Sequence, residues 1–170
     1  FQRLVRMNLA TKEITPLTAH IPWDIEDPEL SPDGKTLAFV VNQAGASVLH
    51  LMDAHSGKEL KQPRLPLGVI SGLEWRPRER ELAFTLTSAR SPSDVYSLEL
   101  ERGKLERWTE SETSGLNPQS FVEPQWVELK SFDGVAISAL VYRPDPARFP
   151  GKRPALISIH GGPEAQARPI

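Results

Sequence analysis

Short segments in which apolar and polar residues alternate, separated by turn residues, fill most of the chain before residue 113. A period of two is typical of β-strands that bury one face and expose the other. The clearest strands are predicted at 36–41, 48–52, 81–87 and 94–100. No segment has a helical period of useful length, so this part of the chain is predicted to be all β.

The strand pattern repeats. ELSPDGKTLAF at 29–39 aligns with EWRPRERELAF at 74–84 at an offset of 45 residues, and residues 48–51 correspond to 95–98 at an offset of 47. In addition, residues 4–18 match 95–109 at an offset of 91. We therefore expect the chain to contain two copies of one unit and to open with the last half of a preceding copy.

Turn residues divide each unit into short strands. In Ser31-Pro32-Asp33-Gly34, proline presets its φ angle and glycine tolerates positive φ, so one strand can fold back on the next. Four-stranded units of about 40 to 45 residues are typical of β-propeller blades, and a propeller needs about four to eight of them to close. The repeat thus predicts about two and a half blades of a propeller.

The pattern changes after a linker predicted at 113–123. Two strands are predicted at 126–132 and 135–142, joined by Asp133-Gly134, a strong hairpin signal. A proline-rich loop at 143–153 leads to the apolar segment 154–159, which is predicted to be a strand buried on both faces, as in α/β sheets. This segment runs directly into the sequence His-Gly-Gly-Pro at 160–163.

The order of these features resembles the prolyl oligopeptidase family of serine peptidases. LSPDGKTLAF is similar to the blade repeat of TolB and prolyl oligopeptidase propellers, and IHGGPEA is most similar to the bacterial branch related to acylaminoacyl-peptidases and dipeptidyl peptidases. The resemblance implies a mainly β fold with two parts. Residues 1–120 would be the C-terminal blades of a β-propeller, and residues 121–170 the N-terminal strands of a truncated α/β-hydrolase catalytic domain. We expect the sequence to be a piece of a longer chain that supplies the missing blades and the rest of the hydrolase domain.

The resemblance also places a candidate site at His160, Gly161 and Gly162. In α/β-hydrolases the loop after the third strand supplies a backbone donor to the oxyanion, and by resemblance Gly162, with Gly161 beside it, takes that position. From the local residues alone, the same sequence is also an ordinary turn leaving a strand. His160 either orients the loop or acts on substrate, and the structural role is favoured. The nucleophile, the acid and the base of the family are not assigned to any of the 170 residues.

The function implied by the resemblance is hydrolysis of short peptides through an acyl-enzyme, with the piece itself inactive because the Ser-Asp-His triad is absent. One alternative is a non-enzymatic propeller module that binds other proteins. A carboxylesterase is a weaker alternative, because propeller blades upstream count against it. A Gly-x-Ser-x-Gly sequence further along the parent chain would favour the enzyme over the binding module.

Composition excludes several kinds of partner and site. The 170 residues include 20 Lys and Arg against 22 Asp and Glu, a net charge of -2, so neither a nucleic acid nor a membrane surface is an expected partner. With no cysteine, thiol catalysis and thiolate metal sites are excluded. No metal site is predicted, and no cofactor is implied because acyl transfer needs none. The sequence leaves open whether the parent forms oligomers and whether it is cytoplasmic or periplasmic.

Overall fold

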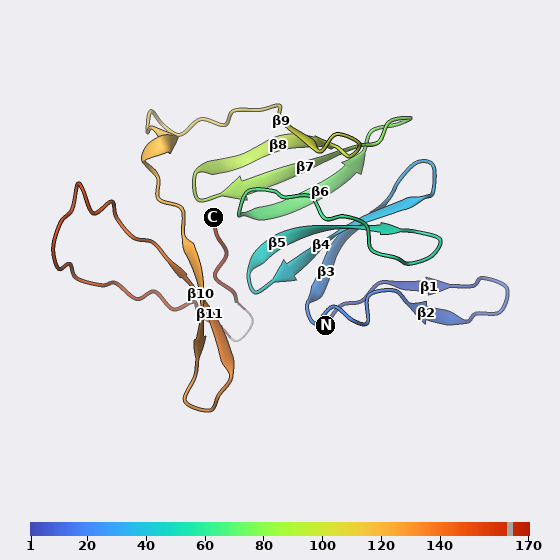
Figure 1. The fold of residues 1–170 in the computed structure, drawn as a ribbon, viewed down its shortest axis with the longest axis horizontal. Helices are drawn as coiled ribbons and strands as arrows, with labels where there is room; N and C mark the ends of the chain where they lie inside the picture. The colour runs from blue at the N-terminus through green and yellow to red at the C-terminus, as the bar shows by residue number, and fades with distance from the viewer. Residues whose placement is uncertain (163–164) are drawn as a thin grey trace.

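Antiparallel sheets make up nearly all of the regular structure. The computed structural model describes residues 1–162 and 165–170, and Figure 1 shows four separate sheets arranged in chain order. The smallest are two hairpins, formed by β1 (Val5–Met7) with β2 (Ile14–Pro16) and by β10 (Gln125–Lys130) with β11 (Ala136–Val141). The prediction of a mainly β fold is confirmed. Within the described residues, no helix is long and apolar enough to cross a membrane.

The two larger sheets correspond to the two repeat units. The first contains three strands, β3 (Asp24–Leu30), β4 (Thr36–Gln43) and β5 (Ala46–Asp53). The second contains four strands, β6 (Val69–Trp75), β7 (Glu81–Ser88), β8 (Ser91–Glu99) and β9 (Lys104–Arg107). One short 3₁₀ helix, η1 (Pro118–Ser120), interrupts the linker that follows. All four strands predicted from the alternating pattern are present, each within a few residues of its expected ends.

The same backbone-to-threonine hydrogen bond occurs in the first hairpin and in the last large sheet. The Leu4 amide donates to the Thr18 hydroxyl at 2.9 Å, and the Val95 amide donates to the Thr109 hydroxyl at the same distance. These two pairs lie 91 residues apart, so β1 and β2 are the counterparts of β8 and β9. This shared hydrogen bond agrees with the predicted match between residues 4–18 and 95–109, whereas the number of units in the chain stays a prediction.

Strand pairing corrects one detail of the repeat. Phe39 pairs with His50 in the first large sheet, and Phe84 pairs with Tyr96 in the second. Both pairs are stacked, with ring centroids 5.3 and 6.2 Å apart. His50 is therefore equivalent to Tyr96 at an offset of 46 residues, and the offset of 47 predicted for this strand is wrong. A shift of one residue would have placed the aromatic ring on the opposite face of the sheet.

The first unit also departs from the expected four strands. In place of a fourth strand it has one isolated bridge between Met52 and Glu59. Residues 58–61 correspond to β9 at the offset of 46, and the Leu60 amide donates to the Leu51 carbonyl at 2.8 Å. Pro63 and Pro66 follow and lack the amide hydrogen that would continue this ladder, whereas β9 pairs with β8 over four residues.

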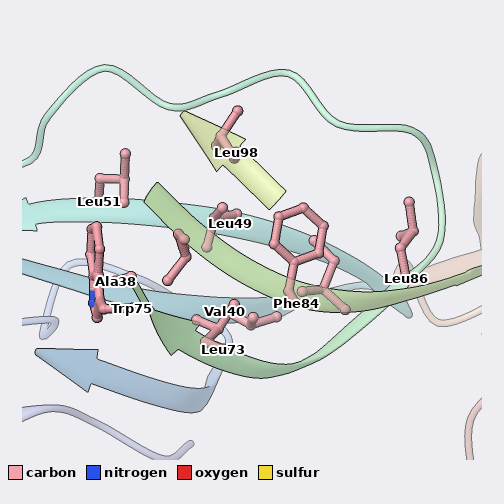
Figure 2. Packing of buried hydrophobic residues seen from close by; sticks show 11 residues of the cluster. Ala38, Val40, Leu49, Leu51, Leu73, Trp75, Phe84, Leu86 and Leu98 are labelled. Carbon is pink, nitrogen blue, oxygen red and sulfur yellow. The ribbon is translucent and has the colours of Figure 1, made fainter. Parts of the chain in front are cut away.

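The main core lies between the two large sheets, as Figure 2 shows. Ala38, Val40, Leu49 and Leu51 project from the first sheet and are at most 5% exposed. The second sheet covers them with its own apolar face, which contributes Ile70, Leu73, Trp75, Leu82, Phe84, Leu86 and Leu98. Each sheet thus buries a face against its neighbour in the chain, the arrangement expected of stacked repeat units.

A β-bulge at the same place in both units connects the two sheets. Pairing shifts between Glu26 and Glu29 in β3, and between Ser71 and Glu74 in β6. Asp27 and its equivalent Gly72 both have positive φ, of 52° and 66°. In this conformation the Asp27 carboxylate accepts a hydrogen bond of 2.8 Å from the amide of Leu73 in the next sheet. The indole of Trp75 adds a second link by donating to the Glu29 carbonyl at 3.2 Å.

A buried carboxylate organises the last sheet. The side chain of Asp94 is fully buried and accepts hydrogen bonds from Ser91, Thr109 and the Ser111 amide at 2.6 to 2.8 Å. The Arg107 guanidinium also contacts it at 2.5 Å. Burial alone would raise the pKa of Asp94, but these hydrogen bonds outweigh it and hold the pKa well below its usual range. The carboxylate therefore joins the start of β8 to the end of β9 and to the linker.

Replacing Asp27 tests the link between the sheets. Alanine disfavours positive φ and leaves the Leu73 amide without its acceptor, so Asp27→Ala should lower the free energy of unfolding by about 1 to 3 kcal/mol. Asparagine tolerates this conformation and keeps an acceptor, so Asp27→Asn should lose less than about half as much. Urea unfolding measures both. Equal stability of wild type and Asp27→Ala would refute the proposed role of the bulge.

Replacing Asp94 tests the carboxylate network. Asp94→Asn should lower the free energy of unfolding at pH 7 by about 2 to 3 kcal/mol, with Glu110→Gln, at an exposed position, as control. Because the folded-state pKa is lowered, this stabilisation is present above the ordinary value near 3.8 and is lost as pH falls through the folded-state pKa. The difference between wild type and Asp94→Asn should therefore shrink from pH 5 to pH 2 in urea unfolding. A constant difference would show that the ionised carboxylate is not its source.

Candidate functional site

The β10–β11 hairpin leads into the candidate site. Gln125 pairs with Val141 and Lys130 with Ala136, which confirms the predicted hairpin. The connection spans residues 131–135, and only Gly134 in it has positive φ, at 84°. The Asp133 carboxylate accepts a hydrogen bond from the Val135 amide at 3.2 Å, and this bond, together with one from Ser131, lowers the pKa of Asp133. The loop is thus longer than the two-residue turn that Asp133-Gly134 predicted.

Two polar contacts attach this part of the chain to the large sheets. The indole of Trp126, in β10, donates to the carbonyl of Ala44 at the β4–β5 turn, at 3.4 Å. Arg90, in the turn between β7 and β8, donates to the Phe121 carbonyl of the linker at 3.1 Å and lies 3.5 Å from the Glu123 carboxylate. The hairpin therefore begins from a linker tied to the second large sheet, and it touches the tip of the first.

The segment 154–159 differs from its prediction. It forms no strand in the structure, and Leu156, Ile157 and Ile159 are 97%, 81% and 85% exposed. A strand buried on both faces needs a strand beside it and layers above and below it. None of the described residues pairs with this segment. The prediction of a buried strand here is wrong for the chain as it stands, because an apolar run alone cannot supply those neighbours.

The loop that follows holds the predicted site residues. His160, Gly161 and Gly162 are all exposed, and Nδ1 of His160 lies 2.9 Å from the Gly161 carbonyl oxygen. Because only an N–H can donate to a carbonyl, this contact places a proton on Nδ1. The histidine side chain is therefore hydrogen-bonded to the backbone of its own loop. Pro163 lies outside the described residues.

Gly161 has no packing reason to be glycine in this structure. A Cβ atom built on it would meet nothing within 4 Å, and its φ lies outside the left-handed region. Glycine is otherwise selected where a backbone must adopt positive φ or where another group approaches it closely. The described residues supply neither condition at this position.

The chain beyond the loop returns to the first large sheet, which sequence reasoning did not predict. Gln166 accepts a hydrogen bond of 3.0 Å from the Asn42 side-chain amide, and Arg168 donates to the Ser47 hydroxyl at 3.1 Å. Each of these contacts spans more than 120 residues, and no local pattern indicates them. The loop at 160–162 therefore lies between two attached stretches of chain.

Curated relatives match parts of the sequence, whereas no protein-family model matches it. A prolyl endopeptidase of Elizabethkingia miricola is 26% identical over 108 residues, which cover 63% of this chain and 15% of that protein. The uncharacterized peptidase YuxL of Bacillus subtilis (strain 168) is 34% identical over 73 residues, which cover 39% of this chain and 11% of that protein. The chain thus matches only a small part of either relative.

Solved structures share the fold. Prolyl oligopeptidase B from Galerina marginata superposes with a TM-score of 0.65 at 15% identity, covering 80% of this chain and 20% of that one. A puromycin hydrolase superposes with a TM-score of 0.64 at 22% identity, covering 82% of this chain and 22% of that one. With these neighbours and the two relatives, the resemblance predicted from the sequence is confirmed.

Hydrogen exchange tests the environment of the site. Because residues 154–162 are exposed and form no ladder, their amides should exchange at nearly intrinsic rates in the 170-residue chain. The amides of β7, paired on both sides, serve as the internal reference and should be strongly protected. Mass spectrometry of deuterated peptides measures both regions. Protection of 154–159 equal to that of β7 would restore the prediction of a paired strand.

Proposed function

We propose that the chain is part of a serine peptidase that hydrolyses short peptides through an acyl-enzyme, and that residues 160–162 form part of its active site. The observation that carries this proposal is that the two curated relatives described above are named as peptidases. The triad lies outside these 170 residues. By itself the chain is therefore inactive, and the stacked sheets of residues 1–120 belong to a propeller that restricts access to the site.

Gly162 has the chemical role in this proposal. Attack on a peptide carbonyl places negative charge on its oxygen, and the backbone N–H of Gly162 donates a hydrogen bond to that oxygen. Such a donor is worth about 3 to 4 kcal/mol of transition-state stabilisation when the nucleophile is in place. Gly161 supports the assignment. Its own packing does not require glycine, and the absence of a side chain leaves room for a substrate beside the backbone.

His160 has an orienting role in the same proposal. Its contact with the Gly161 carbonyl is 2.9 Å long and involves the loop backbone. A histidine held in this way restrains the peptide unit between Gly161 and Gly162, which carries the Gly162 N–H. The base that removes the proton from the nucleophile is a different histidine in the rest of the parent protein.

Substitution of Gly162 in the longer protein tests the proposal. Proline has no N–H, so Gly162→Pro should lower kcat for a chromogenic peptide about 100- to 1000-fold and change KM much less. Gly162→Ala keeps the N–H and should retain more activity than Gly162→Pro. Circular dichroism confirms that both variants are folded. The purified 170-residue chain should show no turnover.

Two outcomes would contradict this account. A kcat equal to that of the wild type in Gly162→Pro would show that the Gly162 N–H does not bind the oxyanion. Turnover by the 170-residue chain would show that the catalytic groups lie within it.

A further inference from the structure

Residues 165–170 pack against the β4–β5 turn in a way that requires glycine there. Ala44 and Gly45 form the tip of this turn with φ of 52° and 97°. A Cβ atom on Gly45 would lie 2.6 Å from the Ala167 carbonyl oxygen, closer than any real contact allows. Pro169, two residues further on, is almost completely buried. The turn and the segment are therefore fitted to each other at the level of the backbone.

Arg168 makes the polar contacts of this junction. Nη2 donates to the Ser47 hydroxyl at 3.1 Å, and Nη1 lies 3.8 Å from the Glu26 carboxylate. The side chain is only 21% exposed, and its Nε atom is buried without a hydrogen-bond partner. The rigid fork of the guanidinium thus reaches two strands of one sheet, β3 and β5, from a distant part of the chain.

The distance along the chain links this junction to the candidate site. Arg168 follows Gly162 by six residues, which can span at most about 20 Å. On its other side, the loop follows the β10–β11 hairpin, whose Trp126 contacts the same β4–β5 turn through Ala44. Trp126 precedes His160 by 34 residues, so the anchor nearest to the loop at 160–162 is Arg168, six residues after Gly162.

From this geometry we infer that Arg168 is a positioning residue, which fixes the loop carrying Gly162 relative to the propeller by clamping the segment after it to Ser47 and Glu26. The expected effect on catalysis rests on the proposed function. The clamp itself is a set of contacts within the described residues and holds whatever the function is. Misplacing a catalytic group by about 1 Å can lower a rate about 100-fold, so a clamp of this kind can affect kcat without touching substrate.

The clamp is tested first in the 170-residue chain. In the wild type, the backbone NMR order parameters of residues 166–170 should be about 0.85, and Arg168→Ala should reduce them below about 0.6. Arg168→Lys keeps the charge but not the fork and should give intermediate values. Ser47→Ala should loosen the same segment from the opposite side, and Arg153→Ala, an exposed arginine before the loop, should leave it unchanged. Unaltered order in both Arg168→Ala and Ser47→Ala would overturn the clamp.

The effect on catalysis is tested in the longer protein. Arg168→Ala should lower kcat about 10- to 100-fold with a change in KM of less than about threefold, and Arg168→Lys should recover part of the loss. The urea midpoint should stay within error of wild type, which separates positioning from general destabilisation. Wild-type kcat in a protein whose segment has been released would overturn the positioning role.

The two proposals fail differently. A longer protein that is folded but has no peptidase activity even as wild type would refute the proposed function, and the order parameters alone would then decide the clamp. An active wild type with unchanged kcat in Arg168→Ala would refute the positioning role and leave the proposed function standing.

Discussion

Burial of one sheet face against the next is the constraint on which this structure depends. Val40 and Leu49 are at most 1% exposed only because the second large sheet covers them. Apolar contact has no direction, so it does not by itself fix how one sheet lies on the other. Directional bonds at the bulge, from the Leu73 amide to Asp27 and from the Trp75 indole to Glu29, supply that orientation. The same first sheet then offers the turn at Ala44 and Gly45 to which the later part of the chain attaches.

The position of the candidate site depends on this attachment. Residues 160–162 are exposed, and as an isolated loop they would have no fixed place. The contact of Arg168 with Ser47, six residues after Gly162, ties the chain beyond the loop to the first sheet, and Trp126 contacts the same sheet further upstream. In the function that we propose, this connection holds the loop with Gly162 at a fixed place relative to the stacked sheets. The geometry thus relates a packing feature of the sheets to the function that we propose.

Features that depend on residues close together in the sequence can be predicted from it, whereas contacts between distant residues cannot. The four strands predicted from alternation, and turns such as the one that contains Gly34, depend on neighbouring residues, and the structure contains them. The offset of 47 was wrong because alternation does not show where an inserted residue lies, whereas the stacked pair of Phe84 and Tyr96 does. The segment 154–159 lacks the neighbours that a buried strand needs. The Arg168 clamp spans 121 residues and leaves no local signal. At the site itself, sequence reasoning named His160, Gly161 and Gly162 by resemblance, and their catalytic role stays a prediction.

The central claim is that these stacked sheets and the loop at 160–162 serve a serine nucleophile elsewhere in a longer chain. Labelling the longer protein with a fluorophosphonate probe, followed by peptide mass spectrometry to locate the label, tests it most directly. The account predicts a single labelled serine outside the 170 residues and no label on the 170-residue chain alone. A label on a serine within these residues, or a folded longer protein that takes no label, would contradict it.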